Sequence, residues 1–119
     1  MRVDTDETQL AALRAMADPL RWRVMQALAR EQLCVCHLVE DLGVTQPLIS
    51  HHLRALRQAG LVETERHRYW TYYRLRPEAV RALSAGIAAL ADQAPTGAEG
   101  RRPCGPDAPT QEPTEEPGT

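Results

Sequence analysis

Residues 33–60 read LCVCHLVEDLGVTQPLISHHLRALRQAG, and this stretch decides the fold. Its aliphatic residues recur at three to four positions, which predicts two helices over residues 33–42 and 45–60. Gly43 is a C-terminal stop for the first helix, and Thr45 is a good N-cap for the second. The apolar positions of the second helix, Ile49, Leu53 and Leu56, are expected to face inward. Two helices joined by so short a turn predict a helix-turn-helix unit.

The outer face of the second helix is polar and basic. Gln46, Ser50, Arg54 and Arg57 fall on one stripe at helical spacing, with His51 beside them. A helix that reads DNA needs a buried side to fix its angle and an outer side of donors for base edges and phosphates. This face meets that demand, and Thr45 at the helix start joins it. An ordinary helical domain with one exposed basic helix has the same pattern.

A change of period after the second helix favours the DNA-reading interpretation. Residues 61–66 and 69–75 alternate in polarity and are rich in Val, Thr, Tyr and Trp, which predicts a two-stranded hairpin. Its turn is expected near His67 and Arg68. The hairpin would form a wing, with Arg66, His67 and Arg68 reaching backbone phosphates or the minor groove.

Helical patterns extend to both sides of this unit. Apolar spacing predicts helices over residues 7–17, from Pro19 to Leu28, and over 77–92. We therefore expect a mainly α domain with one β-hairpin over residues 1–92. Residues 93–119 contain six of the nine prolines and no Leu, Ile or Val, so we expect an acidic disordered tail that carries Cys104.

The composition of the 119-residue chain argues against a membrane or secreted protein. No apolar run is long enough to span a bilayer, and the acidic first residues do not form a secretory signal. We expect a cytoplasmic protein without a membrane partner. Seven Arg and three acidic residues lie between Thr45 and Arg81, a basic patch that suits a polyanion. Three cysteines in a cytosolic chain favour metal binding or redox chemistry over a disulfide framework.

The stretch from Leu33 to Val62 closely resembles the ArsR/SmtB family of bacterial metal-sensing repressors, arsenic-responsive type. The Cys34-Val35-Cys36 and Ser50-His51-His52-Leu53 runs are its most specific parts. Residues 13–28 resemble the first helices of that family, and residues 70–75 resemble its wing. The family's wings often turn through Gly, whereas this chain has Arg66-His67-Arg68-Tyr69, where an Arg with positive φ would be strained.

The resemblance implies a homodimeric winged helix-turn-helix repressor, not an enzyme. Such a dimer would read an inverted-repeat operator in double-stranded DNA, with half-sites about one helical turn apart. The first and last helices of such proteins form the dimer interface. Here that interface would consist of Leu10, Leu13, Val80, Leu83, Ile87 and Leu90.

The two cysteines of the C-x-C run are the expected sensing site. A helix N-terminus lowers a thiol pKa, and thiolates select soft ions. Residues two apart on an ideal helix point in different directions, so Cys34 and Cys36 would share an ion only if the first helical turn opened or distorted. Opening would deform the helix that braces the DNA-reading helix. Two small buried cysteines packed in an apolar helix are the plain structural alternative.

Trivalent arsenic, the expected inducer, prefers three sulfur ligands, and Cys104 is the one cysteine left in the sequence. The tail could fold back onto its own subunit or onto the partner, although Cys104 could also be an incidental thiol. Antimony is a further possible inducer. Zinc, cadmium or lead are alternatives, and His37 could complete a tetrahedral zinc or cadmium site. The family's other zinc site needs paired Asp and His on the last helix, and residues 77–92 contain no His.

Two other readings of the cysteines stay open. A repressor of the same fold could use a thiol switch between Cys34, Cys36 or Cys104 in place of a metal. A small enzyme could use Cys36 as nucleophile with His37 or His51 as base. Adjacent residues diverge on a helix, and the sequence has no Gly-rich phosphate loop, so the enzyme reading has little support.

Overall fold

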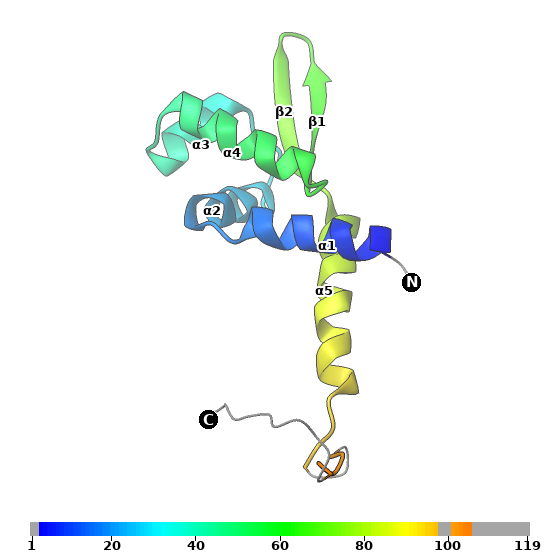
Figure 1. Cartoon of the computed structure of the whole chain (residues 1–119). Helices are drawn as coiled ribbons and strands as arrows, with labels where there is room; N and C mark the ends of the chain where they lie inside the picture. Colours follow the sequence, from blue (N-terminus) through cyan, green and yellow to red (C-terminus); the bar gives the residue numbers. More distant parts are fainter. Residues whose placement is uncertain (1–2, 98–100, 106–119) are drawn as a thin grey trace.

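The chain folds into five helices and one hairpin over the residues that the computed structural model describes, 3–97 and 101–105. The elements are α1 (Val3–Met16), α2 (Pro19–Leu28), α3 (Val35–Leu42), α4 (Gln46–Gln58), β1 (Val62–His67), β2 (Trp70–Leu75) and α5 (Pro77–Gln93). The predicted mainly α fold with a two-stranded hairpin is confirmed. Figure 1 shows α2, α3, α4 and the hairpin gathered at one end, while α5 extends away from them beneath α1.

Local signals fix most helix ends where the sequence predicts them. The Asp18 carboxylate accepts hydrogen bonds of 3.0 Å from the backbone N–H groups of Leu20 and Arg21, and Pro19 opens α2. This N-cap satisfies donors that the first turn leaves unpaired. Gly43 ends α3 in the left-handed region with φ +68°. A residue with a side chain would be strained there.

Two helix starts differ from the expectation. α1 begins at Val3 instead of residue 7, because the apolar pattern that predicts a helix starts only at Leu10 while the acidic residues before it suit the positive end of a helix. α3 begins at Val35 instead of residue 33. Leu33 forms a β-bridge with Tyr73 of β2, and Cys34 has the extended conformation of an N-cap residue.

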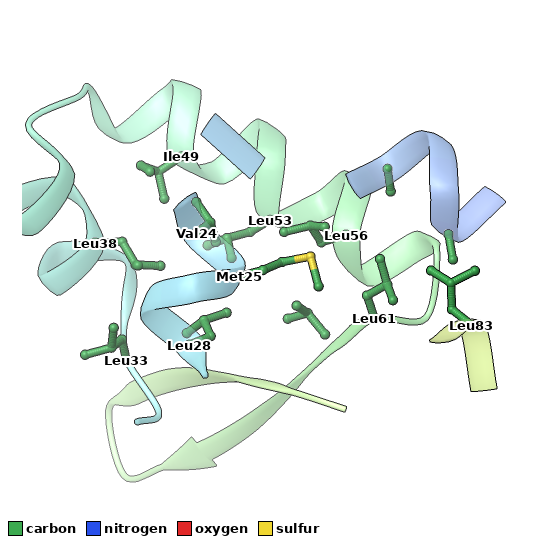
Figure 2. Close-up of a cluster of buried hydrophobic side chains, with 13 residues drawn as sticks. Val24, Met25, Leu28, Leu33, Leu38, Ile49, Leu53, Leu56, Leu61 and Leu83 are labelled. Carbon is green, nitrogen blue, oxygen red and sulfur yellow. The ribbon is translucent and has the colours of Figure 1, made fainter. Parts of the chain in front are cut away.

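The core lies between α2, α3, α4 and the base of the hairpin (Figure 2). Its most completely buried side chains are aliphatic: Val24, Leu38, Ile49, Leu53, Leu56, Leu61 and Val62. Each such side chain contributes roughly 1.5–3 kcal/mol relative to an exposed one. The inward positions predicted for α4 are confirmed, so its opposite face is turned to solvent.

The hairpin pairs β1 with β2 in antiparallel register from Val62↔Leu75 to His67↔Trp70. Glu63 and Arg74 face each other across the strands with 2.7 Å between the carboxylate and the guanidinium. Arg68 turns the chain with φ +56°, so the positive φ expected at this turn is present on a residue other than glycine.

The tail is described only in part. α5 ends at Gln93, and residues 101–105 contain no helix or strand. Residues 98–100 and 106–119, which belong to the segment predicted to be disordered, lie outside the described residues.

Candidate metalloid site and nucleic-acid interface

The expected DNA-reading residues line the exposed side of α4. Gln46, His51, Arg54 and Arg57 are exposed, Ser50 is half-buried, and Thr45 caps the helix start. Pro47 lies in the first turn of α4, where it lacks only an N–H that the helix would leave unpaired. The opposite side of the helix is anchored by Ile49, Leu53 and Leu56. Packing on one side therefore holds a row of donors on the other.

The hairpin tip adds a second group of cationic side chains. Arg66, His67 and Arg68 are all exposed there, and the Arg66 Nε donates to the Arg68 carbonyl at 3.4 Å. This contact spans the turn, and the Arg68 side chain stays exposed to solvent. The tip stands apart from α4 in Figure 1, as a wing does.

The two thiols of the C-x-C run converge. The Sγ atoms of Cys34 and Cys36 lie 2.7 Å apart, and both cysteines are free. Cys34 is buried and Cys36 is exposed, so the pair opens to solvent on one side. Because Cys34 precedes α3 in an extended conformation, its side chain turns toward Cys36 while the helix stays intact. The two sulfur atoms therefore meet without the opening or distortion of the first helical turn that ideal helix geometry predicts.

The helix start shifts the pKa values of the two thiols in opposite directions. Burial opposes ionisation of Cys34, but the Cys36 thiol and the backbone N–H groups of the first turn favour its anion more, so the pKa of Cys34 lies below its ordinary value. The hydrogen bond to Cys34 raises the pKa of Cys36, and burial adds to that rise. Of the two thiols, Cys34 therefore ionises more readily than Cys36.

His37 belongs to the same cluster. Its Nδ1 accepts from the backbone N–H of Cys34 at 3.3 Å and lies 3.3 Å from the Cys34 Sγ. Ligand atoms of Cys34, Cys36 and His37 all lie within 4.8 Å of one another, which is a donor set suited to a soft or borderline ion. The hydrogen bond from the Cys34 N–H also makes His37 part of the N-terminal cap of α3.

Cys104 does not join this cluster within the described part of the chain. It is exposed, and its segment lies beyond the far end of α5 in Figure 1, opposite α3. A third sulfur at Cys34 and Cys36 of one chain would have to come from a rearranged tail or from a partner subunit.

The thiol pair is joined directly to the wing. Leu33 and Tyr73 exchange two backbone hydrogen bonds, of 3.1 Å and 2.8 Å, immediately before Cys34. The α3 start on the other side of Cys34 leads through Gly43 to α4. A shift of Cys34 would therefore act on both β2 and the helix pair.

The spacing of residues on α4 predicts no role for His52, although the two consecutive histidines, His51 and His52, are a visible signal in the sequence. His52 is 7% exposed and lies on the buried side of α4, where its Nδ1 lies 3.0 Å from an Arg21 guanidinium nitrogen and its Nε2 lies 3.9 Å from the Asp18 carboxylate. Since Arg21 can only donate, the His52 Nδ1 must accept, which requires a neutral ring. Arg21 also donates to the Ala15 carbonyl at 2.6 Å, so this network ties α4 to the junction of α1 and α2.

This network predicts that stability falls in acid. Burial lowers the pKa of His52 below its ordinary 6.5, outweighing the attraction of Asp18. The unfolded state therefore binds more protons below pH 6.5, so stability present above that pH is lost as the pH falls. Between about pH 7.5 and about pH 5.5, urea unfolding should show a larger loss of stability in the wild type than in His52→Gln.

His67→Gln is the matched control, because His67 is exposed at the wing tip. It should keep the pH dependence of the wild type. If the unfolding free energy falls equally with pH in the wild type and in His52→Gln, His52 does not control the loss of stability in acid.

The expected interface residues divide into two groups. Leu10, Leu13, Ile87 and Leu90 on α1 and α5 are 40–70% exposed, an unusual state for large aliphatic side chains. Leu83 is different: it is 5% exposed and belongs to the core of its own chain. Val80 is half-buried against the same core. Leu83 therefore holds α5 within its own chain, and its part in the expected interface stays a prediction.

Known proteins that match this chain in sequence are bacterial regulatory proteins. Residues 18–64 match the family model described as bacterial regulatory protein, arsR family. The arsenic resistance transcriptional regulator ArsR1 of Pseudomonas putida is 41% identical over 80 residues, which cover 66% of this chain and 62% of that protein. The arsenical resistance operon repressor of Bacillus subtilis is 40% identical over 86 residues, covering 66% of this chain and 82% of the repressor.

A solved structure has the same architecture. The homodimeric winged helix-turn-helix domain from Mycobacterium bovis, a possible ArsR-family regulator, superposes with a TM-score of 0.64 at 25% identity, over 77% of this chain and 85% of that one. Among the described residues, no helix combines the length and apolar character needed to cross a membrane. Fold, helix-turn-helix sequence and relatives agree that the chain belongs to the ArsR family of bacterial regulatory proteins, with the winged helix-turn-helix fold.

Proposed function

We propose that this chain is a homodimeric transcriptional repressor that binds an inverted-repeat operator when metal-free and leaves it when trivalent arsenic binds Cys34 and Cys36. The observation that carries this proposal is the convergence of the two thiols, 2.7 Å apart, at the start of the helix that braces α4. The names of the Pseudomonas and Bacillus relatives point to the same ligand. The protein would act in the cytoplasm.

The DNA contacts are proposed to come from α4 and the wing. Gln46, Ser50 and His51 would reach base edges in the major groove, while Arg54 and Arg57 would contact phosphates. Thr45 would add its hydroxyl near the helix N-terminus, where backbone N–H groups also favour a phosphate. Arg66 and Arg68 at the wing tip would contact the backbone beside the half-site.

The dimer is proposed to form through α1 and α5. Leu10, Leu13, Ile87 and Leu90 give an apolar surface that a second copy would cover. The Mycobacterium bovis relative is homodimeric, and a two-fold dimer places two recognition helices about one turn of DNA apart. This spacing is the physical reason for an inverted-repeat operator.

Trivalent arsenic suits the thiol pair because soft thiolates favour soft ions and the low pKa of Cys34 supplies the first anion. Cys104, from a rearranged tail or from the partner, would be the third sulfur. Antimony shares this preference for thiolates. Cadmium, lead or zinc would be a better match if His37 gave up its bond to the Cys34 N–H and became a ligand.

Ligand and operator are proposed to act on one structural element, the segment around Cys34. Binding of an ion would reposition the Cys34 side chain and its cap contact with His37. The Leu33–Tyr73 bridge would carry this change to the wing, and α3 would carry it to α4. If operator binding needs the apo arrangement, then ion and DNA weaken each other's affinity by the same factor.

An operator titration tests the proposal. A labelled duplex is first selected by the purified protein from a random inverted-repeat library. Fluorescence anisotropy then follows its release by arsenite, zinc and cadmium, for the wild type and Cys104→Ser in parallel. We expect arsenite to lower operator affinity by about tenfold to hundredfold in the wild type, a coupling typical of allosteric proteins.

The variant separates the possible ligand sets. Loss of the arsenite response in Cys104→Ser supports the tail cysteine as third ligand, whereas an equal response shows that the pair suffices. Release by zinc or cadmium alone contradicts arsenic as inducer and favours the Cys34–Cys36–His37 set. Release by oxidant in metal-free buffer favours a thiol switch in place of metal sensing.

A further inference from the structure

A hollow of about 400 Å³ lies directly beside the thiol pair. It is bounded by the start of α3, the first residue of α4 and β2, and its lining residues are Cys34, Val35, Cys36, Val39, Glu40, Gln46, Trp70 and Thr71. Val35, Val39 and the Trp70 ring supply apolar surface, while Glu40, Gln46 and Thr71 are polar. Trp70 is 56% exposed, so one part of its indole is open to a ligand.

The volume of the hollow is larger than a single ion held by the two thiols would occupy. A cavity of about 150 Å³ lined by apolar side chains is enough to bind benzene. An arsenic atom bonded to both sulfurs would fill only the part of the space next to Cys34 and Cys36. The rest of the space, walled by two valines and an indole, suits a small apolar or aromatic group.

The number of thiols points to the same class of ligand. Within the described residues, each chain brings only two thiols together, and Cys104 is exposed elsewhere. Inorganic trivalent arsenic has three exchangeable positions, so a pair of thiols leaves one of them unfilled. A monosubstituted arsenical has a carbon group at the third position and two exchangeable positions, which match the pair.

We propose that this site binds monosubstituted trivalent arsenicals, with both arsenic–sulfur bonds made to Cys34 and Cys36 and the carbon group seated in the hollow against Trp70, Val35 and Val39. The inference deepens the proposed function, on which it rests, by naming an organic class of inducer. The carbon group replaces the third sulfur, so this ligand does not need Cys104.

The binding step is a ligand exchange without oxidation or reduction. R–As(OH)₂ and the two thiols give R–As(S–Cys)₂ and two water molecules. Two arsenic–oxygen bonds break and two arsenic–sulfur bonds form, and each departing hydroxide leaves as water with one thiol proton.

The test compares two ligands that make the same bonds but differ in the carbon group. Phenylarsine oxide, as its hydrate, and methylarsonous acid are bound to full-length Cys104→Ser protein, and native mass spectrometry measures each affinity against dithiothreitol as competitor. The competitor removes the intrinsic preference of any dithiol for either compound. We expect the protein to prefer the phenyl compound by about tenfold, because the ring is buried against apolar side chains.

Trp70→Ala should reduce this preference to about threefold or less while methylarsonous acid still binds, which shows that the variant is folded. Tyr69→Ala is the matched control, since Tyr69 is the neighbouring wing aromatic, is 88% exposed and does not line the hollow. It should keep the full preference.

The inference would be overturned if the protein preferred the phenyl over the methyl compound no more than dithiothreitol does. It would also be overturned if Trp70→Ala and Tyr69→Ala lost this preference equally. The proposed function would survive that result if arsenite still released the operator. Failure of both arsenicals to bind, together with an operator that arsenite cannot release, would overturn the inference and the proposed function together.

Discussion

Replacing Cys34 and Cys36 together by Ser should leave operator binding within about twofold of the wild type and raise the arsenite concentration for half-release by roughly a hundredfold or more. The hydroxyls are hard ligands that stay protonated at neutral pH, so the soft ion loses both of its anchoring anions. Operator binding should persist because α4 is held in the core by Ile49, Leu53 and Leu56, which the substitutions leave unchanged. Anisotropy titration of the selected duplex measures both quantities.

The single variants test the division of roles within the pair. Cys34→Ser removes the thiol whose pKa is lowered, whereas Cys36→Ser removes the thiol whose pKa is raised. Stopped-flow release near neutral pH should therefore be slowed more by Cys34→Ser. Arsenite release that is unchanged in the double variant would show that the sensing site lies elsewhere in the chain.

The second large effect concerns the apolar surface of α1 and α5. Ile87→Asp combined with Leu90→Asp should convert the dimer to a monomer, because two carboxylates per chain would have to be buried at the contact. The selected duplex should then be bound at least about a hundredfold more weakly, since linking two half-site contacts raises apparent affinity by 10²–10⁴. Light scattering reports the mass, and anisotropy reports the affinity.

Ala85→Asp is the control on the same helix. At 3.6 residues per turn, Ala85 lies on the side of α5 opposite to Ile87 and Leu90, and it is exposed. This variant should remain dimeric and bind DNA as the wild type does. A folded Ile87→Asp/Leu90→Asp protein that stays dimeric would place the interface on another surface.

Local signals in the sequence predicted most of the fold, because they act between residues close in the chain. The Asp18-Pro19 pair, Gly43 and Thr45 determine helix ends through their own backbone preferences. The two apolar periods distinguish helices from the hairpin without any tertiary information. The row of donors on α4 follows from the same spacing, since an inward stripe defines an outward one.

Long-range contacts decided the features that the sequence predicted wrongly or did not show. The bridge between Leu33 and Tyr73 holds the residue before Cys34 in an extended path, so α3 starts later and the two thiols meet without opening it. Leu83 packs into its own chain although its spacing matches that of Ile87 and Leu90. His52 is buried on the inner side of α4 because Asp18 and Arg21 approach it from the α1–α2 junction.

The sequence by itself thus determined the elements, their order and the chemistry available at Cys34, Cys36 and α4, because these depend on residue type and short-range spacing. Only the tertiary structure decided which of these groups meet: the thiols with each other and with His37, and Trp70 with the hollow beside them. The hollow brings Cys34 and Trp70 together from positions 36 residues apart, and the thiols meet because the Leu33–Tyr73 bridge sets the path before Cys34. Both depend on packing between elements that no local pattern specifies.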